Sequence, residues 1–166
     1  MSKASIVYLS LGSNLGDRYQ NLLNALTELS NKVGTVKLIS HTYENPPSGF
    51  QADKDFLNLC AEVHTELPPQ ELLSLIKAIE KELGRSKNDT EGYSSRPIDI
   101  DIILYNTLVL NSKELTIPHP HFRKRMFVLK PLNDIAKDQI DPETMLTIGQ
   151  LLNNCSDQSI MRIYKR

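Results

Sequence analysis

The order of extended and helical segments most constrains what this chain of 166 residues can fold into. Apolar residues at helical spacing predict one helix between Asp17 and Gly34 and a second between Pro69 and Gly84. Runs of apolar and β-branched residues predict strands over 5–10, 36–43, 56–67 and 96–105. The order β-α-β, β-α-β predicts an α+β ferredoxin-like sandwich, with four antiparallel strands and two helices on one face of the sheet. The C-terminal third must add to that core.

Composition limits the class of protein. With 40% hydrophobic and 23% charged residues, we expect one globular domain over 1–166, in a monomer. No apolar run is long enough to span a membrane, and the N-terminal residues do not resemble a signal peptide, so a cytoplasmic protein is expected. A net charge of −1 argues against a nucleic-acid partner. Cys60 and Cys155 form no CxxC motif, which favours thiols without a metal.

The segment 96–105 places two carboxylates inside an apolar strand. Asp99 and Asp101 would share one face with Cα atoms about 6.5–7 Å apart, followed there by Ile103 and Tyr105. Two such carboxylates repel each other unless a cation lies between them, and a partly buried pair favours a hard ion such as Mg²⁺. The segment is equally compatible with a half-buried strand whose aspartates simply face solvent.

Two polar connections, 44–55 and 85–95, are long for a compact domain, and we expect both to close over a ligand. The turn-rich segment 12–17 matches neither GxGxxG nor GxxxxGK[ST], so a phosphate loop is excluded there. Its glycines predict a tight turn after the first strand that leaves Asn14 accessible as an amide donor and acceptor. A purely structural turn fits the spacing as well.

Basic residues cluster around these connections, and their convergence on the aspartate strand would suit a phosphate ligand. The candidates are Arg85, Lys87, Arg96 and Arg125. His119, fixed between two prolines, could donate a hydrogen bond to the same ligand. Each is also compatible with an ordinary surface cation or turn histidine, and Arg123 and Lys124 with a charged face. Apolar walls for a flat ring, or plain core packing, could come from Pro46, Pro47, Phe56 and Phe127.

Together these segments resemble the 6-hydroxymethyl-7,8-dihydropterin pyrophosphokinase family over nearly the whole chain. The combination of an Arg-x-x-Asp-x-Asp strand with a following proline-histidine segment is highly specific. The matching segments are Leu11-Gly12-Ser13-Asn14, Tyr43-Glu44-Asn45-Pro46-Pro47, Phe56-Leu57-Asn58, Glu80 ahead of Gly84-Arg85, Arg96 to Ile102, Pro118-His119, Arg125 and Phe127. The family fold, a ferredoxin-like α/β/α sandwich, agrees with the predicted order of elements.

The resemblance implies transfer of the terminal pyrophosphate of ATP to the hydroxymethyl group of a reduced pterin, with release of AMP. It implies that Asp99 and Asp101 bind two Mg²⁺ ions and act in catalysis together with Arg85 and Arg96. The implied contacts with ATP are Glu80, Arg85, Lys87, Arg96, Ile102, His119 and Arg125. The implied contacts with the pterin are Asn14, Asn45, Pro46, Pro47, Phe56, Asn58 and Phe127.

Three positions depart from the family pattern. Lys87 replaces a loop arginine and loses its bidentate geometry, Tyr93 stands where some members have tryptophan, and Phe56 replaces a common tyrosine. Two rival functions stay open on the sequence alone. A non-catalytic binding module would not need the two aspartates, whereas a different two-metal phosphotransferase would need them and release ADP or phosphate.

Overall fold

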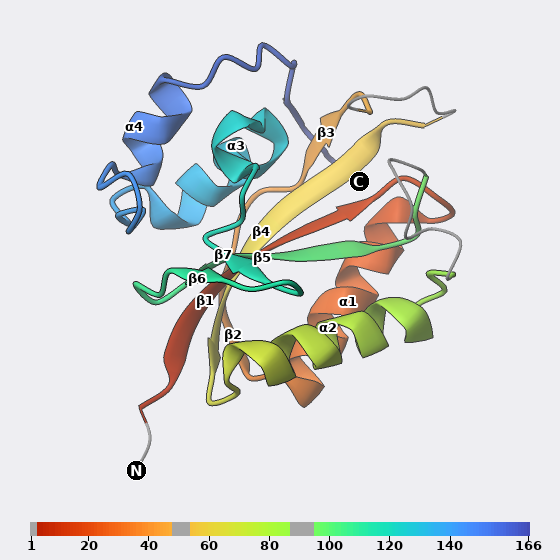
Figure 1. Cartoon of the computed structure of the whole chain (residues 1–166). Coiled ribbons are helices and arrows are strands. Elements are labelled where there is room, and N and C mark those ends of the chain that lie inside the picture. The colour runs from red at the N-terminus through yellow and green to blue at the C-terminus, as the bar shows by residue number, and fades with distance from the viewer. Residues whose placement is uncertain (1–2, 48–53, 87–94) are drawn as a thin grey trace.

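The structure, a computed structural model, describes residues 3–47, 54–86 and 95–166. It is built around a sheet with strand order β5-β1-β4-β3-β8, in which β2 also pairs with β4 (Figure 1). The strands are β1 (Ser5–Ser13), β2 (Thr35–Ile39), β3 (Tyr43–Asn45), β4 (Phe56–Thr65), β5 (Asp99–Tyr105) and β8 (Arg162–Ile163). A separate two-stranded sheet pairs β6 (Leu110–Asn111) with β7 (Thr116–Ile117). All the pairings are antiparallel, as the sequence predicts.

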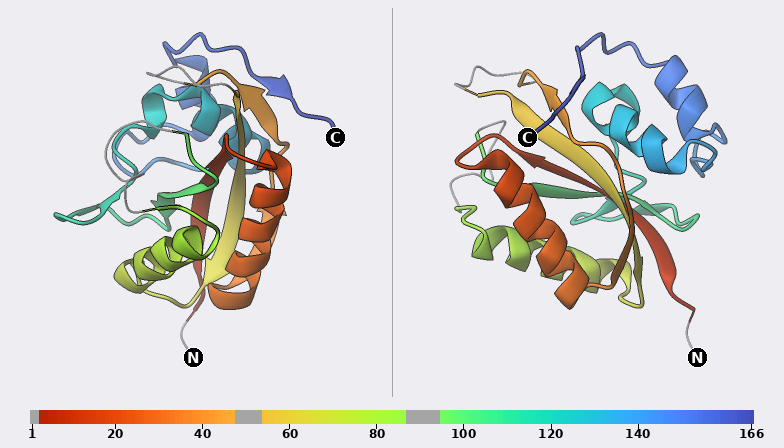
Figure 2. Two further views of the ribbon diagram at one scale, coloured as in Figure 1. Left: turned by 90° about the vertical axis from the view of Figure 1, so that its right-hand side faces the viewer. Right: turned by 180° about the vertical axis from the view of Figure 1, so that it is seen from behind.

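Helices cover both faces of the sheet. The helices α1 (Arg18–Lys32) and α2 (Pro69–Glu82) lie on one face, and α3 (Met126–Ala136) and α4 (Ile148–Asn153) lie on the other (Figure 1). The views in Figure 2 show the same three layers from the side and from behind. The apolar side chains separate into two buried clusters, one beneath α1 and α2 and one beneath α3 and α4. The predicted ferredoxin-like α/β/α sandwich is confirmed.

The first two helices begin and end close to the residues that the sequence predicts. The Asp17 side chain accepts a hydrogen bond from the Gln20 N–H at 3.1 Å and so caps α1. Helix α2 opens on a proline, whose missing N–H costs nothing in the first turn. Gly84, with φ +103, follows α2 in a conformation that favours glycine. None of the helices in the described ranges is long and apolar enough to cross a membrane.

The prediction of a single strand over 36–43 is wrong in its extent, because β2 and β3 both occupy that region. The register with β4 slips between Val36 and Leu38, and the Cys60 N–H bonds the Ser40 hydroxyl at 2.9 Å. This side-chain bond interrupts the ladder and separates β2 from β3. The first strand also runs further than predicted, through Gly12 to Ser13, so the predicted turn begins later.

A β-bulge in the aspartate strand corrects a second prediction. The pairing of β1 with β5 slips so that Tyr8 faces Leu104 while Leu9 faces Ile102, which leaves Ile103 as the extra residue. One extra residue reverses the alternation of side chains beyond it. Ile103 therefore packs with α3 and α4, whereas Tyr105 joins the cluster under α1 and α2 rather than following the aspartates.

Candidate active site

The two aspartates of β5 lie beside arginines from both ends of the preceding connection. Asp99 Oδ1 is 2.9 Å from Arg85 Nη1 and 3.3 Å from Arg96 Nη1. The side chains of Asp99 and Asp101 remain 30% and 37% exposed, so a ligand can reach both. The predicted convergence of arginines on the aspartate strand is therefore present in the geometry.

Glu80, a buried residue of α2, also contacts this group of aspartates and arginines. One carboxylate oxygen, Oε2, accepts hydrogen bonds from Arg85 Nη1 and, at 2.9 Å, from the Ile100 N–H. The residue is only 6% exposed. Burial, followed by repulsion from Asp99, raises the pKa of Glu80 to about 7. Glu80 thus holds Arg85 in place at the side of the two aspartates.

Asp101 is electrostatically strained by its acidic neighbours. Loss of hydration, followed by repulsion from Asp99 and Glu80, raises its pKa to about 7. Arg125 and Arg85 oppose that rise without cancelling it. A cation placed at these carboxylates would relieve the repulsion.

The donor set fits a hard divalent cation, because carboxylate oxygens are the ligands that Mg²⁺ prefers. Within the described ranges, no group of three or more His, Cys, Asp or Glu side chains gathers in a form that could hold a metal alone. Asp99 and Asp101 would therefore supply part of a coordination sphere. Mg²⁺ usually takes its remaining oxygens from water and substrate phosphates.

His119 faces the aspartates as a neutral donor. Its Nδ1 accepts a hydrogen bond from the His121 N–H at 3.1 Å, so the ring proton is on Nε2. That nitrogen lies 3.9 Å from Asp101 Oδ2. Burial, reinforced by the charge of Arg125, lowers the pKa of His119 to about 4. The ring is thus uncharged near neutral pH and directs one N–H toward the cluster.

A second set of predicted residues lies at the β1, β3 and β4 ends. Asn58 Nδ2 donates to Asn45 Oδ1 at 2.7 Å, and Asn45 Nδ2 donates to the Pro46 carbonyl at 3.1 Å. Both asparagines are buried, Pro47 and Phe56 are half-buried and Pro46 is exposed. Gly12 lies against this pair, because a Cβ there would meet Asn58 Oδ1 at 2.5 Å. Glycine at this position leaves the space that the Asn58 amide occupies.

Phe127 and Arg125 come from the start of α3. The Arg125 guanidinium lies 5.5 Å from the centre of the Phe127 ring, which supports a cation–π contact. Phe127 is half-buried against the cluster under α3 and α4. The aromatic ring and the arginine are thus presented together at one helix terminus.

Three predicted site residues are placed differently or lie outside the described ranges. The prediction of an accessible Asn14 is wrong, because the residue is 2% exposed. Its Oδ1 accepts from the Arg96 N–H at 2.6 Å and its Nδ2 donates to Ser95 Oγ at 3.1 Å. Ile102 is buried in the core, so its side chain is closed off from a ligand. Lys87 lies outside the described residues, as does Tyr93.

Arg18 is a residue that sequence reasoning missed. From the first position of α1, its Nη1 bonds Glu44 Oε2 at 2.6 Å and the Asp55 carbonyl at 2.8 Å. These two partners flank the connection between β3 and β4, so Arg18 joins the bases of that connection. A basic residue directly after a helix cap gives no signal of such a role, since its partners are distant in sequence.

The sequence matches the family model described as 7,8-dihydro-6-hydroxymethylpterin-pyrophosphokinase over residues 8–137. It is 47% identical over 134 residues to a Porphyromonas gingivalis protein named 2-amino-4-hydroxy-6-hydroxymethyldihydropteridine pyrophosphokinase, covering 80% of this chain and 91% of that one. A Bacillus subtilis protein of the same name is 37% identical over 163 residues, covering 98% and 92%.

A solved structure has the same fold. The Plasmodium falciparum HPPK-DHPS structure superposes with a TM-score of 0.73 at 19% identity. The match covers 93% of this chain but only 45% of the solved one, so this chain spans less than half of that larger protein. At this identity the likeness concerns the fold alone.

Proposed function

The chain belongs to the 7,8-dihydro-6-hydroxymethylpterin-pyrophosphokinase family, and on that premise we propose how its residues share the work of the family reaction. The reaction transfers pyrophosphate from ATP to 6-hydroxymethyl-7,8-dihydropterin in folate biosynthesis and leaves AMP. The contacts around Asp99 are the observation that supports placing the ATP phosphates here. Because the sequence has no phosphate loop, arginines and metal-binding carboxylates have to hold the phosphates, and both kinds of side chain lie together at Asp99.

Arg85, Arg96, His119 and Arg125 bind the triphosphate in this proposal. Arg85 and Arg96 pair with Asp99, and bound phosphate oxygens would take over these guanidinium donors. His119 would add its Nε2–H without adding charge. Glu80 contributes by orienting Arg85 from beneath. Because phosphoryl-type transfer depends on position and charge neutralisation, such fixed donors are the contribution that a protein can make.

Asp99 and Asp101 are the residues that would hold Mg²⁺, and two ions are proposed. When bound, the ions would neutralise phosphate charge and help align the reacting oxygens. The repulsion that raises the pKa of Asp101 supports this assignment, since a cation would remove it. Asp99 would exchange its arginine partners for the cation as these arginines turn to phosphate.

The pterin end is assigned to the asparagine pair and the aromatic residues. Asn58 and Asn45 already bond each other and present fixed donors and acceptors for the edge of a ring. Phe56 and Phe127 would stack on its two faces, with Pro46 and Pro47 closing one side. A wrong ring would leave the buried amides unpaired, which gives strong selectivity. Asn14 is assigned here a supporting role, because its amide holds Ser95 and Arg96.

Product analysis tests this proposal. Purified protein with ATP, Mg²⁺ and 6-hydroxymethyl-7,8-dihydropterin should form AMP in step with pterin pyrophosphate, and chelation of Mg²⁺ by EDTA should stop it. ADP or inorganic phosphate as the pterin-dependent product would instead favour a different phosphotransferase. Undiminished AMP formation in EDTA would overturn the metal assignment alone. A monomeric, single-domain protein in the cytoplasm stays part of the same proposal.

A further inference from the structure

Asp141 is a fully buried carboxylate outside the site described above. It accepts hydrogen bonds from Arg123 Nε at 2.6 Å and Arg123 Nη2 at 2.9 Å. The Thr144 hydroxyl at 2.7 Å and the Glu143 N–H at 3.1 Å complete its partners. Backbone bonds from the Asp141 N–H to the Leu146 carbonyl and from the Met145 N–H to the Asp141 carbonyl close the turn 141–146. This turn therefore presents a preorganised acceptor to Arg123.

The pairing between Arg123 and Asp141 is of the strong, geometrically specific kind. Two parallel N–H donors of one guanidinium meet one carboxylate, and the guanidinium also lies 4.9 Å from the centre of the Phe122 ring. Glu143 adds a second ion pair at 3.2 Å. Removal of Arg123 would leave the buried Asp141 carboxylate without its counterion, and the local backbone would have to move to rehydrate it.

Arg123 belongs to the segment 119–125, which carries two of the residues proposed to donate hydrogen bonds to the triphosphate. His119 lies four residues before it and Arg125 two residues after it. The short helix η2 (Phe122–Lys124) joins them, and its N-terminal side is held by the bond from the His119 N–H to the Ile103 carbonyl and by the buried Phe122 ring. Arg123 is the charged attachment of the same helix to the C-terminal region.

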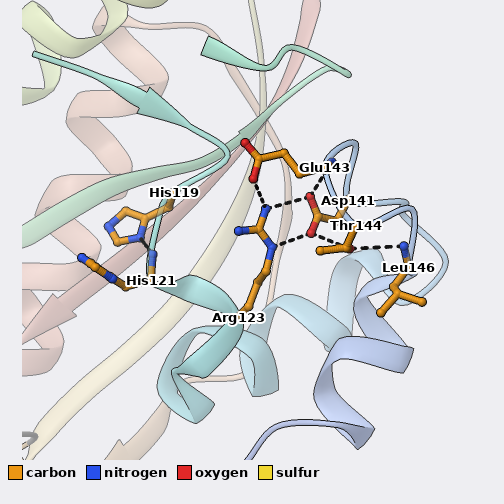
Figure 3. Close-up of polar contacts among 7 residues, drawn as sticks. All are labelled: His119, His121, Arg123, Asp141, Glu143, Thr144 and Leu146. Carbon is orange, nitrogen blue, oxygen red and sulfur yellow. Dashed lines mark hydrogen bonds and ion pairs between the residues drawn. The ribbon is translucent and has the colours of Figure 1, made fainter. Parts of the chain in front are cut away.

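The direction of the side chains separates two roles within this segment. Figure 3 shows Arg123 extending from η2 toward Asp141 and Glu143, while His119 and His121 extend to the other side. His119 Nε2 points toward Asp101, as its 3.9 Å separation from Oδ2 indicates. Arg123 can therefore influence a nucleotide by fixing the backbone, whereas His119 can contact it.

We propose that Arg123 is a positioning residue for the nucleotide, whose pairing with Asp141 fixes the segment that presents His119 and Arg125. The inference rests on the proposed function, because it takes the triphosphate as the ligand of that segment. The turn 141–146 then has a role in substrate binding although it makes no contact with the substrate. Without the pairing, the segment samples positions in which the two donors are misaligned, and nucleotide affinity falls.

The test measures nucleotide affinity and turnover separately. Arg123→Gln removes the charge, Arg123→Lys keeps the charge without the bidentate geometry, and Asp141→Asn removes the acceptor charge. The dissociation constant of a non-hydrolysable ATP analogue with Mg²⁺ should rise about tenfold in Arg123→Gln, and less in Arg123→Lys. The KM for ATP should rise in parallel. The KM for the pterin at saturating ATP should stay within about twofold, because Asn45, Asn58 and Phe56 are untouched and Phe127 is packed against the cluster under α3 and α4.

Thr147→Ala is the matched control. Thr147 caps α4 in the same region of the molecule, so its loss lowers stability without touching the segment 119–125. It should leave the analogue affinity at the wild-type value. If Arg123 and Asp141 act as one unit, Arg123→Gln combined with Asp141→Asn should bind the analogue no more weakly than the worse single variant.

Three results would overturn the inference. Wild-type analogue affinity in Arg123→Gln, equal weakening by Thr147→Ala, or an equal rise in both KM values would each reduce Arg123 to a purely structural residue. If Asp141→Asn does not fold, the comparison of Arg123→Lys with Arg123→Gln decides by itself. A wild-type protein that binds no nucleotide would refute the proposed function as well, which distinguishes the two failures.

Discussion

Asp99 and its neighbours show how charge is balanced among the side chains of the site. Asp99 is paired with Arg85 and Arg96, and Glu80 shares Arg85 from beneath. Asp101 makes a longer contact of 3.9 Å with the neutral His119 ring. This contact does not offset the repulsion that Asp101 experiences from Asp99 and Glu80. Asp101 and Glu80 therefore both carry an unfavourable interaction with their acidic neighbours, which is the arrangement expected where a cation has to bind.

Replacement of Asp101 by asparagine should stabilise the ligand-free protein. The folded pKa of about 7 lies above the ordinary value of 3.8, so the folded state holds more protons than the unfolded state between these values. The free energy of unfolding of the wild type should fall as pH rises through that window, and asparagine removes this contribution. Because more than a third of the side chain is exposed, we expect a gain of about 1 kcal/mol near pH 8.

Urea unfolding with EDTA present checks this expectation. Wild-type protein and Asp101→Asn should differ most near about pH 8 and least near about pH 3, where the aspartate is mostly neutral in both states. An Asp101→Asn protein that is less stable than the wild type at the higher pH would show that the carboxylate is held by favourable contacts instead.

At the residue scale, the sequence predicts which side chains belong to the site, but it does not predict the hydrogen-bond partners that are distant in the chain. The aspartate pair and its arginines could be predicted because they are close together in the chain. The prediction of an accessible Asn14 fails because its partners Ser95 and Arg96 are distant in sequence, and no local pattern distinguishes a buried amide from an accessible one. The sequence indicates only a charged face at Arg123 for the same reason, since Asp141 becomes its neighbour after folding.

At the scale of elements, the end of β1 shapes the proposed pterin site. Gly12 pairs with Asn58 on β4 and with Asp99 on β5, so one strand connects the asparagine pair with the aspartates. A side chain at Gly12 would displace the Asn58 amide, which bonds Asn45 at 2.7 Å. The need for a glycine within a strand explains why a predicted tight turn proved to be extended backbone.

Gly12→Ala should weaken pterin binding selectively. Its Cβ would lie 2.5 Å from Asn58 Oδ1, so the amide must rotate away and lose its alignment with Asn45. We expect the KM for the pterin to rise about tenfold with a small change in the KM for ATP. Steady-state kinetics with each substrate varied in turn measure both. Gly149→Ala in α4 is the matched control, and similar kinetics for the two variants would contradict the assignment.

The order of helices and strands could be predicted more accurately than the residues at which they begin and end. Helical spacing and capping residues located α1 and α2, because these signals are local. The division into β2 and β3 depends on a hydroxyl bond between Ser40 and Cys60, and the change of face at Tyr105 depends on a bulge opposite β1. Both arise from pairing between distant strands, so a local pattern does not contain them.

At the scale of the whole molecule, the site draws on both buried clusters. Glu80 and Arg85 come with α2 from one side of the sheet, whereas His119, Arg125 and Phe127 come with η2 and α3 from the other. The aspartate strand lies between them. The C-terminal third, which the sequence placed only as an addition to the core, therefore supplies the donors that face the aspartates.

The measurement that tests this account most directly is AMP formation by Asp101→Asn beside the wild type at saturating ATP, Mg²⁺ and pterin. Asp138→Asn, at an exposed aspartate just beyond the C-terminus of α3, serves as the matched control. The account predicts turnover reduced by at least about a hundredfold in Asp101→Asn, with Asp138→Asn at the wild-type rate. Near wild-type turnover in a folded Asp101→Asn protein would contradict the central role of the aspartate strand.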